Sequence, residues 1–294
     1  MFSIFIWENT KMNVTLVVVL LFLVVAGTVV LHFFAWDTGW WFSPLASNWS
    51  SIDNAILITF WVTGFVFVTL SLFLIYCVWK YRYQKNRKSE YKPEDKKLEV
   101  ILGVISAIAV AALLAPGLSV WNSYIKVPKD ALTVEVLAYQ WGWNYRLPGE
   151  DGVLGKTSIR NISDDNPYGL YLEDPYGKDD IIVQDADLHL QLDVNVNFLL
   201  RSIDVLHNFY VPEFRAKMDM VPGLVTYYWI TPTKKGEYEI LCAELCGIGH
   251  YAMFGVVVVE EEKDYSNWLA QQMSFEQILA QNKIKNKTIQ LAEK

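Results

Sequence analysis

The sequence predicts a membrane-anchored all-β protein, in which apolar helices precede a domain built from short strands. Three observations predict this class. Long apolar segments fill much of the first 125 residues, and apolar and polar residues alternate with a period of two from Ala131 onward, which is typical of half-buried strands. Hydrophobic residues make up 53% of the 294 residues and charged residues 19%, a mixture that indicates apolar spans joined to a polar domain.

Three apolar segments are predicted to cross the membrane, over residues 14–36, 53–79 and 99–124, and to form an anchor over residues 1–125. A span of about 20 residues is enough to cross a bilayer. A cleaved signal peptide is the alternative for the first segment. That segment has neither a short apolar core nor a clear small-x-small cleavage site, so we expect a retained helix.

The charges between the segments predict their orientation. The loop from Trp36 to Ser51 contains four tryptophans and neither Lys nor Arg, as expected outside the cytoplasm near a membrane interface. The next loop carries a basic run from Lys80 to Lys88, which the positive-inside rule keeps in the cytoplasm. The chain after Tyr124 is therefore expected on the outer side. Binding of nucleic acid is the alternative for the basic run, but a short loop between two spans needs no such role, and the net charge of −7 of the whole chain also argues against it.

The outer domain is expected over residues 126–262, with a helical tail over residues 263–294. Alternating residues indicate strands around Val134, from Leu188 to Val196 and from Val225 to Trp229. Several short strands separated by turns predict a β-sandwich or a barrel.

Two further features of this domain are a stretch rich in turn-forming residues and a histidine on a predicted strand. The stretch from Leu147 to Asp180 is rich in Gly, Asp, Asn and Pro, which predicts a long surface excursion between early strands. His189 falls opposite the apolar face of its strand, so we expect a solvated side chain rather than a ligand.

The stretch from Cys242 to Met253 concentrates the side chains that bind metals. It contains two thiols, one imidazole and one thioether, from Cys242, Cys246, His250 and Met253. Thiolates and thioethers are soft ligands and imidazole is borderline, a set that suits copper. Strand patterns on both sides predict a strand–loop–strand unit in which the four side chains converge, with His207 as the candidate for a further ligand.

Other interpretations of the two cysteines remain open. A disulfide between Cys242 and Cys246 would suit an exported domain, but it leaves His250 and Met253 without a role. A structural zinc site would need a fourth Cys or His. The spacing does not match the haem c attachment signature.

The same stretch resembles the copper loop of subunit II of haem–copper cytochrome c oxidases. It matches every fixed position of the family pattern Cys-x-Glu-x-Cys-Gly-x-x-His-x-x-Met. Asp204-Val205-Leu206-His207 matches the family's upstream histidine motif. The resemblance runs from about Asp53 to the end of the outer domain, and it implies a cupredoxin-like Greek-key β-barrel.

The resemblance implies a dinuclear copper centre called CuA. Six residues would supply its ligands: His207, Cys242, Glu244, Cys246, His250 and Met253. The two thiolates would bridge both copper ions. His207 and the thioether would complete one copper, and His250 with the backbone carbonyl of Glu244 would complete the other. The Glu244 side chain would also bind a magnesium ion shared with subunit I, and Asp204 would support His207.

Two further roles are implied only by the resemblance. Gln140-Trp141-Gly142-Trp143 matches the family motif Gln-Trp-x-Trp, whose first tryptophan accepts electrons from cytochrome c, although Gly142 stands where an aromatic residue is common. An ordinary core cluster is the alternative. Glu99 aligns with a glutamate near the start of a proton path in subunit I, and an exposed interfacial carboxylate is its alternative.

The resemblance implies a cytochrome c oxidase subunit in a bacterial inner (plasma) membrane, multi-pass, with the copper domain in the periplasm. Electrons from cytochrome c would pass through the copper centre to haem in subunit I, where oxygen is reduced to water with proton translocation. Subunits I and III would be partners. The electron-accepting subunit of a CuA-containing nitric oxide reductase and a copper-delivery protein are the alternatives. A quinol oxidase subunit II lacks the copper ligands, and nitrous oxide reductase carries its loop on a large soluble catalytic domain.

The outer domain is acidic. Between Asn122 and Glu260 there are 20 acidic and 11 basic residues, a net charge of −9. Such a domain would steer a basic cytochrome c toward it. A generic acidic exported domain is the alternative.

Overall fold

The computed structural model describes most of the chain, namely residues 14–37, 42–88, 91, 93–163, 166–184 and 186–292, without the side chains of residues 36–37 and 285–292. The chain divides into two compact units. One unit comprises Met1–Ser43 and Ser51–Ser119, and the other comprises Pro44–Ser50 and Val120–Lys294.

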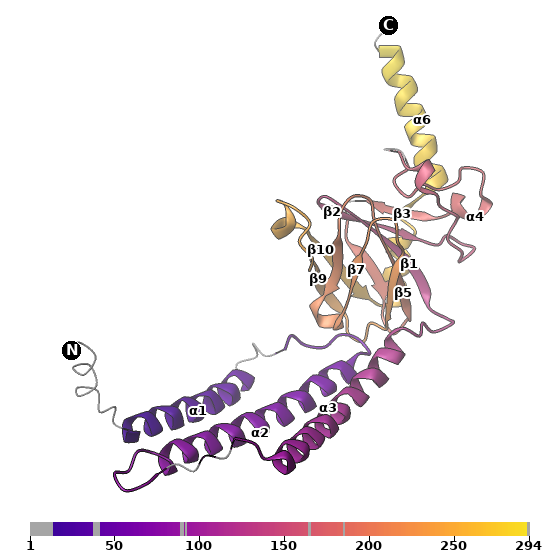
Figure 1. Ribbon diagram of the computed structural model, residues 1–294. Helices are drawn as coiled ribbons and strands as arrows, with labels where there is room; N and C mark the ends of the chain where they lie inside the picture. Colours follow the sequence, from indigo (N-terminus) through magenta and orange to yellow (C-terminus); the bar gives the residue numbers. More distant parts are fainter. Residues whose placement is uncertain are drawn as a thin grey trace, which may run out of the picture. The chain divides into compact units, whose positions relative to one another are not determined.

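The amino-terminal unit is helical. Its helices are α1 (Val14–Asp37), α2 (Ser50–Lys80) and α3 (Lys96–Tyr124) (Figure 1). Each contains a segment that is long and apolar enough to cross a membrane. None of the residues that the structure describes in α2 or α3 is buried, so apolar side chains are left exposed around both helices. Helices that are apolar on all sides are typical of membrane spans.

The tryptophans expected at the membrane interface have different outcomes. The side chains of Trp36, Trp40 and Trp41 lie outside the described residues. Trp49 is 3% exposed and packs inside the carboxy-terminal unit. Its indole donates a hydrogen bond to the Trp229 carbonyl (2.9 Å), and the two rings meet edge to face at 5.0 Å. Trp49 therefore fastens its segment to the β domain.

The carboxy-terminal unit confirms the predicted all-β domain, which is built from two sheets (Figure 1). One sheet has six strands in the order β11 (Met273–Ser274), β3 (Ile181–Gln184), β2 (Gly142–Leu147), β1 (Leu132–Tyr139), β5 (Val196–Ser202) and β8 (Thr226–Ile230). The other sheet has five strands in the order β4 (Leu188–Gln191), β10 (Phe254–Glu260), β9 (Gly236–Cys242), β6 (His207–Val211) and β7 (Ala216–Met220). The pairs β1–β5 and β4–β10 are parallel.

Aromatic rings join the two sheets. Phe198 on β5 lies 5.4 Å from Phe209 on β6, centroid to centroid, and Trp143 on β2 lies 5.3 Å from the same ring. On β1 the predicted strand is confirmed, and Val134 and Val136 are fully buried in this core. The strand is not half-buried as predicted, because Glu135 between them is only 3% exposed and both faces are covered. Large aromatic side chains bury the most apolar area per residue, so these contacts dominate the packing between the sheets.

The prediction of one strand from Leu188 to Val196 is wrong. The run divides at Asp193, which adopts a left-handed backbone conformation with φ of 59°. The two halves are β4 and β5, which belong to different sheets. Aspartate tolerates this conformation better than most residues, so a local turn interrupts an otherwise regular alternation.

In the strand predicted from Val225 to Trp229, now β8, the alternation of Val225, Tyr227 and Trp229 predicts that these three residues face the core, and this is wrong. The structure buries Tyr228 and Ile230, whereas Val225 is 57% exposed and Tyr227 is 42% exposed. Trp229 is only partly buried. Because this strand carries aromatic residues on both faces, alternation alone could not show which face lies toward the core.

His189 is not simply solvated as predicted. Its Nδ1 lies 2.6 Å from a carboxylate oxygen of Glu260, and its side chain is 20% exposed. The imidazole stacks on Trp268 with centroids 4.5 Å apart. It therefore helps to hold α5 (Glu262–Leu269) against β4.

The predicted tail is not wholly helical. It contains α5, the two-residue strand β11 and α6 (Phe275–Ala292). Strand β11 pairs with β3, so the tail extends the six-stranded sheet. The apolar cluster there combines Leu137 and Ile182 of the sheet with Tyr168 and Leu170 of the excursion and Phe275 of α6, and Ile278 and Leu279 pack against it.

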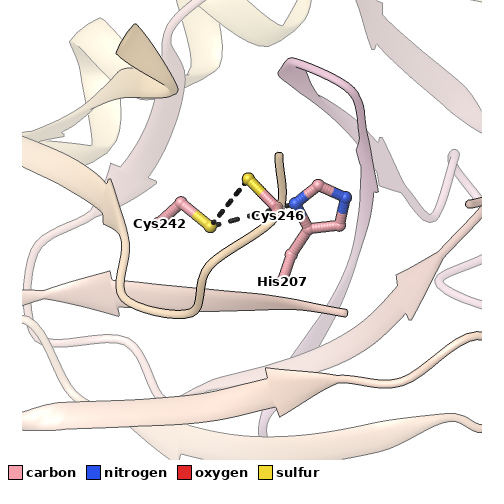
Figure 2. A group of neighbouring side chains, drawn as sticks. All are labelled: His207, Cys242 and Cys246. Carbon is pink, nitrogen blue, oxygen red and sulfur yellow. Dashed lines mark hydrogen bonds between the residues drawn. The ribbon is translucent and has the colours of Figure 1, made fainter. Parts of the chain in front are cut away.

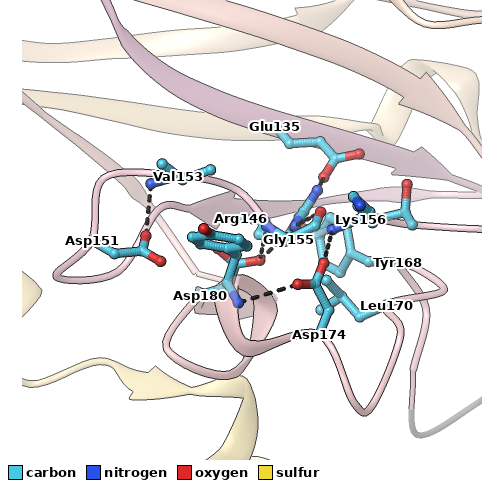
Figure 3. Close-up of polar contacts among 12 residues, drawn as sticks. Glu135, Arg146, Asp151, Val153, Gly155, Lys156, Tyr168, Leu170, Asp174 and Asp180 are labelled. Atoms are coloured by element: carbon cyan, nitrogen blue, oxygen red, sulfur yellow. Dashed lines mark hydrogen bonds and ion pairs between the residues drawn. The ribbon is translucent and has the colours of Figure 1, made fainter.

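The excursion between β2 and β3 contains the short helices η1 (Ile159–Asn161) and α4 (Pro175–Lys178). A buried group of charges fastens it to the sheet (Figure 3). Arg146 pairs with Glu135 and with Asp180, and Nη1 lies 2.6 Å from the Asp180 carboxylate. Nη1 of Arg201 lies 2.7 Å from Glu135, which balances the two carboxylates with two guanidinium groups.

Replacement of Arg146 by Met is expected to lower the free energy of unfolding by about 3–5 kcal/mol, because it leaves buried carboxylates without their partner. Urea unfolding of the full chain in detergent, followed by tryptophan fluorescence, measures this loss. Lys235→Met is the control, since Lys235 pairs with Glu261 at 2.8 Å in a site where both side chains are more than half exposed. If Arg146→Met lowered the free energy of unfolding no more than this control does, the buried charges would not be what fastens the excursion to the sheet.

Candidate metal centre

Strand pairing brings the two ends of the loop from Cys242 to Met253 together. Cys242 ends β9, Met253 precedes β10, and these strands are antiparallel neighbours. Strand β6 pairs with the other edge of β9, with Phe209 opposite Cys242. His207 begins β6, so this register places it beside the first cysteine although 35 residues separate them.

The sulfur and nitrogen atoms of this region converge (Figure 2). The two Sγ atoms are 3.7 Å apart, and Cys242 Sγ lies 3.8 Å from Nδ1 of His207. Cys246 Sγ lies 3.6 Å from Nδ1 of His250 and 3.8 Å from Sδ of Met253. The ligand atoms of His207, Cys242 and Cys246 all lie within 4.8 Å of one another.

The Glu244 carbonyl completes the group. Its oxygen lies 3.2 Å from Cys242 Sγ. The structure thus brings together all six residues that the sequence predicts as copper ligands. Four of their side chains are buried, with exposed fractions of 9% or less, in His207, Cys242, Cys246 and Met253.

The chemistry of this group fits copper. Cys242 and Cys246 are free thiols, and their separation of 3.7 Å is well beyond the S–S bond of about 2.05 Å. Two thiols, two imidazoles and a thioether form a soft donor set, which suits copper better than a hard cation. A disulfide would use only the two cysteines and would leave the other converging donors unexplained.

The two thiols differ in acidity. Burial alone would raise the pKa of Cys242, but hydrogen bonds from His207 and from the Asn208 and Glu244 backbone lower it to about 6. Burial and the neighbouring Cys242 raise the pKa of Cys246 to about 11. Cys242 is therefore the first thiolate at neutral pH, and binding of a metal must displace the proton of Cys246.

Asp204 orients His207. Its Oδ1 lies 2.9 Å from Nε2 of His207, which leaves Nδ1 directed at Cys242. A carboxylate on the remote ring nitrogen of a metal-binding histidine fixes the tautomer and the ring orientation. Burial lowers the pKa of His207, but the contacts with Cys242 and Asp204 outweigh it and raise the pKa overall. Trp143 is 3% exposed and packs beside this imidazole, with ring centroids 6.4 Å apart.

Trp141 lies against the loop, whereas Glu99 belongs to the other unit. The Trp141 indole Nε1 donates to the Cys246 carbonyl at 3.3 Å, and its side chain is 39% exposed. Glu99 is exposed in the first turn of α3.

The sequence interpretation missed Gln140 as a contact of the centre, although its place in the Gln-Trp motif was a usable signal. Gln140 Nε2 donates to the same carbonyl at 2.8 Å.

A loop with this donor set, between paired strands of a two-sheet β domain, defines a cupredoxin-like domain whose donor group suits copper. The family model described as "Cytochrome C oxidase subunit II, periplasmic domain" matches residues 132–261. The alternative cytochrome c oxidase subunit 2 of Bradyrhizobium diazoefficiens is 51% identical over 268 residues, which cover 91% of this chain and 96% of that protein. The chain therefore belongs to the cytochrome c oxidase subunit 2 family and is a subunit of an oxidase.

Two further matches are more distant. Cytochrome c oxidase subunit 2 of Cereibacter sphaeroides is 27% identical over 237 residues, covering 78% of this chain and 77% of that protein. The crystal structure of the periplasmic domain of subunit II from Bradyrhizobium japonicum is 25% identical, covers 49% of this chain and 95% of that domain, and has a TM-score of 0.37.

Proposed function

We propose that this chain is the subunit through which electrons reach a cytochrome c oxidase. It accepts electrons from cytochrome c at a dinuclear copper centre and passes them to haem in subunit I, where oxygen is reduced to water with proton translocation. One observation carries the proposal: two free thiols lie 3.7 Å apart, and the four other predicted ligand groups, from two distant segments, converge on them.

The chain's own residues would hold two copper ions in a fixed cage. Cys242 and Cys246 would hold the ions together with the four groups around them, which come from His207, Glu244, His250 and Met253. A copper pair in this site supplies a one-electron redox centre. Because the loop is anchored by strands at both ends and Asp204 fixes His207, the ligands need to move little when the charge changes.

The alternatives fit less well. A copper-delivery protein has no use for a partly exposed tryptophan bound to the backbone of a ligand residue, as Trp141 is. A nitric oxide reductase could use the same electron-accepting domain, but the relatives that match most of this chain are named as oxidase subunits. The oxidase therefore remains the preferred assignment.

Electron paramagnetic resonance of the copper-loaded full chain tests the centre. We expect a seven-line hyperfine pattern, because one unpaired electron would be shared by two copper nuclei. Cys242→Ser should abolish this pattern, since it removes a bridging thiolate. Cys77→Ser is the matched control and should retain the pattern, because Cys77 lies on α2. A four-line mononuclear spectrum from the unmodified chain would overturn the assignment of a dinuclear centre.

Trp141 and the acidic surface would serve the electron donor. The Trp141 ring is 39% exposed and is hydrogen-bonded to the Cys246 carbonyl, so it would offer an electron donor at the surface a short path to the copper centre. The net charge of −9 between Asn122 and Glu260 would attract a basic cytochrome c. The expected electron donor is therefore a positively charged protein that docks beside Trp141.

We expect the association rate with cytochrome c to fall as the ionic strength rises from about 0.01 M to about 0.15 M, because salt shortens the range of the attraction. Stopped-flow measurements on the assembled oxidase give this rate. An uncharged small-molecule reductant is the control and should show no such dependence. An association rate that does not change with salt would contradict electrostatic steering.

The remaining partners follow from the same proposal. The three apolar helices within residues 1–125 would cross the inner membrane of a bacterium. They would place the copper domain, residues 126–262, in the periplasm, and the tail, residues 263–294, beside it. Subunits I and III would contact this chain in the membrane. The Glu244 carboxylate would bind magnesium with ligands from subunit I, since carboxylate oxygen suits that hard cation.

We further propose that Glu99 marks the start of a proton path. It is exposed in the first turn of α3, at the cytoplasmic end of the proposed span. Glu99→Gln should lower proton-coupled turnover severalfold in the assembled oxidase, because an amide cannot carry the proton. Glu94→Gln is the control, as Glu94 is exposed in the preceding loop. Equal turnover in both variants would refute the role of Glu99.

A further inference from the structure

The turn between β1 and β2 is bound to the metal loop through one backbone atom. The Cys246 carbonyl accepts a hydrogen bond from Gln140 Nε2 at 2.8 Å and another from Trp141 Nε1 at 3.3 Å. A carbonyl oxygen has two lone pairs and can accept both bonds. Two adjacent side chains therefore converge on the backbone of a proposed copper ligand.

Gln140 is also bound on the other side of the centre. Its backbone N–H donates to Asp204 Oδ2 at 2.7 Å, while Asp204 Oδ1 lies 2.9 Å from Nε2 of His207. Gln140 thus links His207 to Cys246 without being a ligand itself. This link fixes the position of the turn relative to both sides of the cage.

Two glycines let the turn approach closely. A Cβ added at Gly249 would lie 2.3 Å from the Trp141 ring, and one at Gly247 would lie 2.9 Å from Gln140 Nε2. Gly249 has φ of −89°, a conformation open to other residues, so the ring rather than the backbone conformation requires glycine there. The ring rests directly on the loop backbone.

We infer that Gln140 is the positioning residue that holds the Trp141 ring in register with the Cys246 carbonyl. The inference rests on the proposed function, in which Trp141 receives the electron. One electron leaves reduced cytochrome c, which is oxidised, and the copper centre is reduced by one electron. One side of the ring rests on the loop backbone while the ring stays 39% exposed, and the Gln140 amide, bound to the same carbonyl as the indole, restrains the turn that carries the ring.

Gln140→Met and Gln140→Asn test this role in the assembled oxidase. Methionine keeps the length of the side chain and removes the donor, and asparagine keeps the amide but is one methylene shorter. We expect electron transfer within the bound complex to slow by about tenfold, since small errors of position are costly in such steps. The dissociation constant of cytochrome c and the copper resonance spectrum should not change. Gln184→Met, at an exposed position of β3, is the matched control and should transfer electrons at the unmodified rate.

A spectroscopic readout separates positioning from general damage. Ultraviolet resonance Raman difference spectra against Trp141→Phe isolate the bands of the Trp141 indole. In Gln140→Met these bands should shift toward a weaker N–H hydrogen bond, while in Gln184→Met they should not. If Gln140→Met fails to assemble, Gln140→Asn supplies the same comparison.

The outcomes show whether the positioning role of Gln140 fails alone or together with the proposed role of Trp141. If Trp141→Phe slows transfer but the Gln140 variants do not, the positioning role is overturned and the proposed function stands. If Trp141→Phe leaves the rate unchanged, the role of Trp141 fails and the inference fails with it. A raised dissociation constant with an unchanged internal rate would make Gln140 a contact of the donor. An altered copper spectrum would make it a support of the ligands, and either result overturns the inference.

Discussion

The pairing of β9 with both β6 and β10 is the constraint on which the metal centre depends. Pairing with β10 brings the two ends of the loop together, and pairing with β6 brings His207 beside Cys242. Main-chain hydrogen bonds fix both registers, and the aromatic core around Phe209 holds the sheets that carry them. Since a shift of one residue would turn every side chain of a strand to the opposite face, His207 would leave the centre if the register between β6 and β9 changed.

The candidate centre shows how soft donor groups can converge in a rigid frame. Its donors are supplied by a loop, but the loop begins and ends in adjacent strands, and the Gln140–Asp204 link restrains it from outside. Such surrounding contacts decide how far a ligand can move when the charge of a metal changes. A rigid cage would cost little reorganisation, which suits the electron transfer that we propose.

The domain is also stabilised far from the metal. The excursion between β2 and β3 is fastened by Arg146, Glu135 and Asp180, all nearly inaccessible to solvent, and by an apolar cluster shared with α6. Charges buried in this way stabilise a fold only while every partner is present. They favour one arrangement of the excursion, and so the outer face of the six-stranded sheet is covered by a fixed structure.

The sequence by itself determined the class of the protein, its apolar helices, the all-β domain and the candidate ligands. These follow from local patterns: long apolar runs, alternation along β1, and a loop motif whose residue types have distinctive chemistry. Only the tertiary structure decided the division of Leu188–Val196 between two sheets, the buried face of β8, the pairing of Arg146 and the contact of Gln140 with Cys246. Each of these depends on a partner distant in the chain, and a local pattern contains no information about which distant residue will lie opposite it.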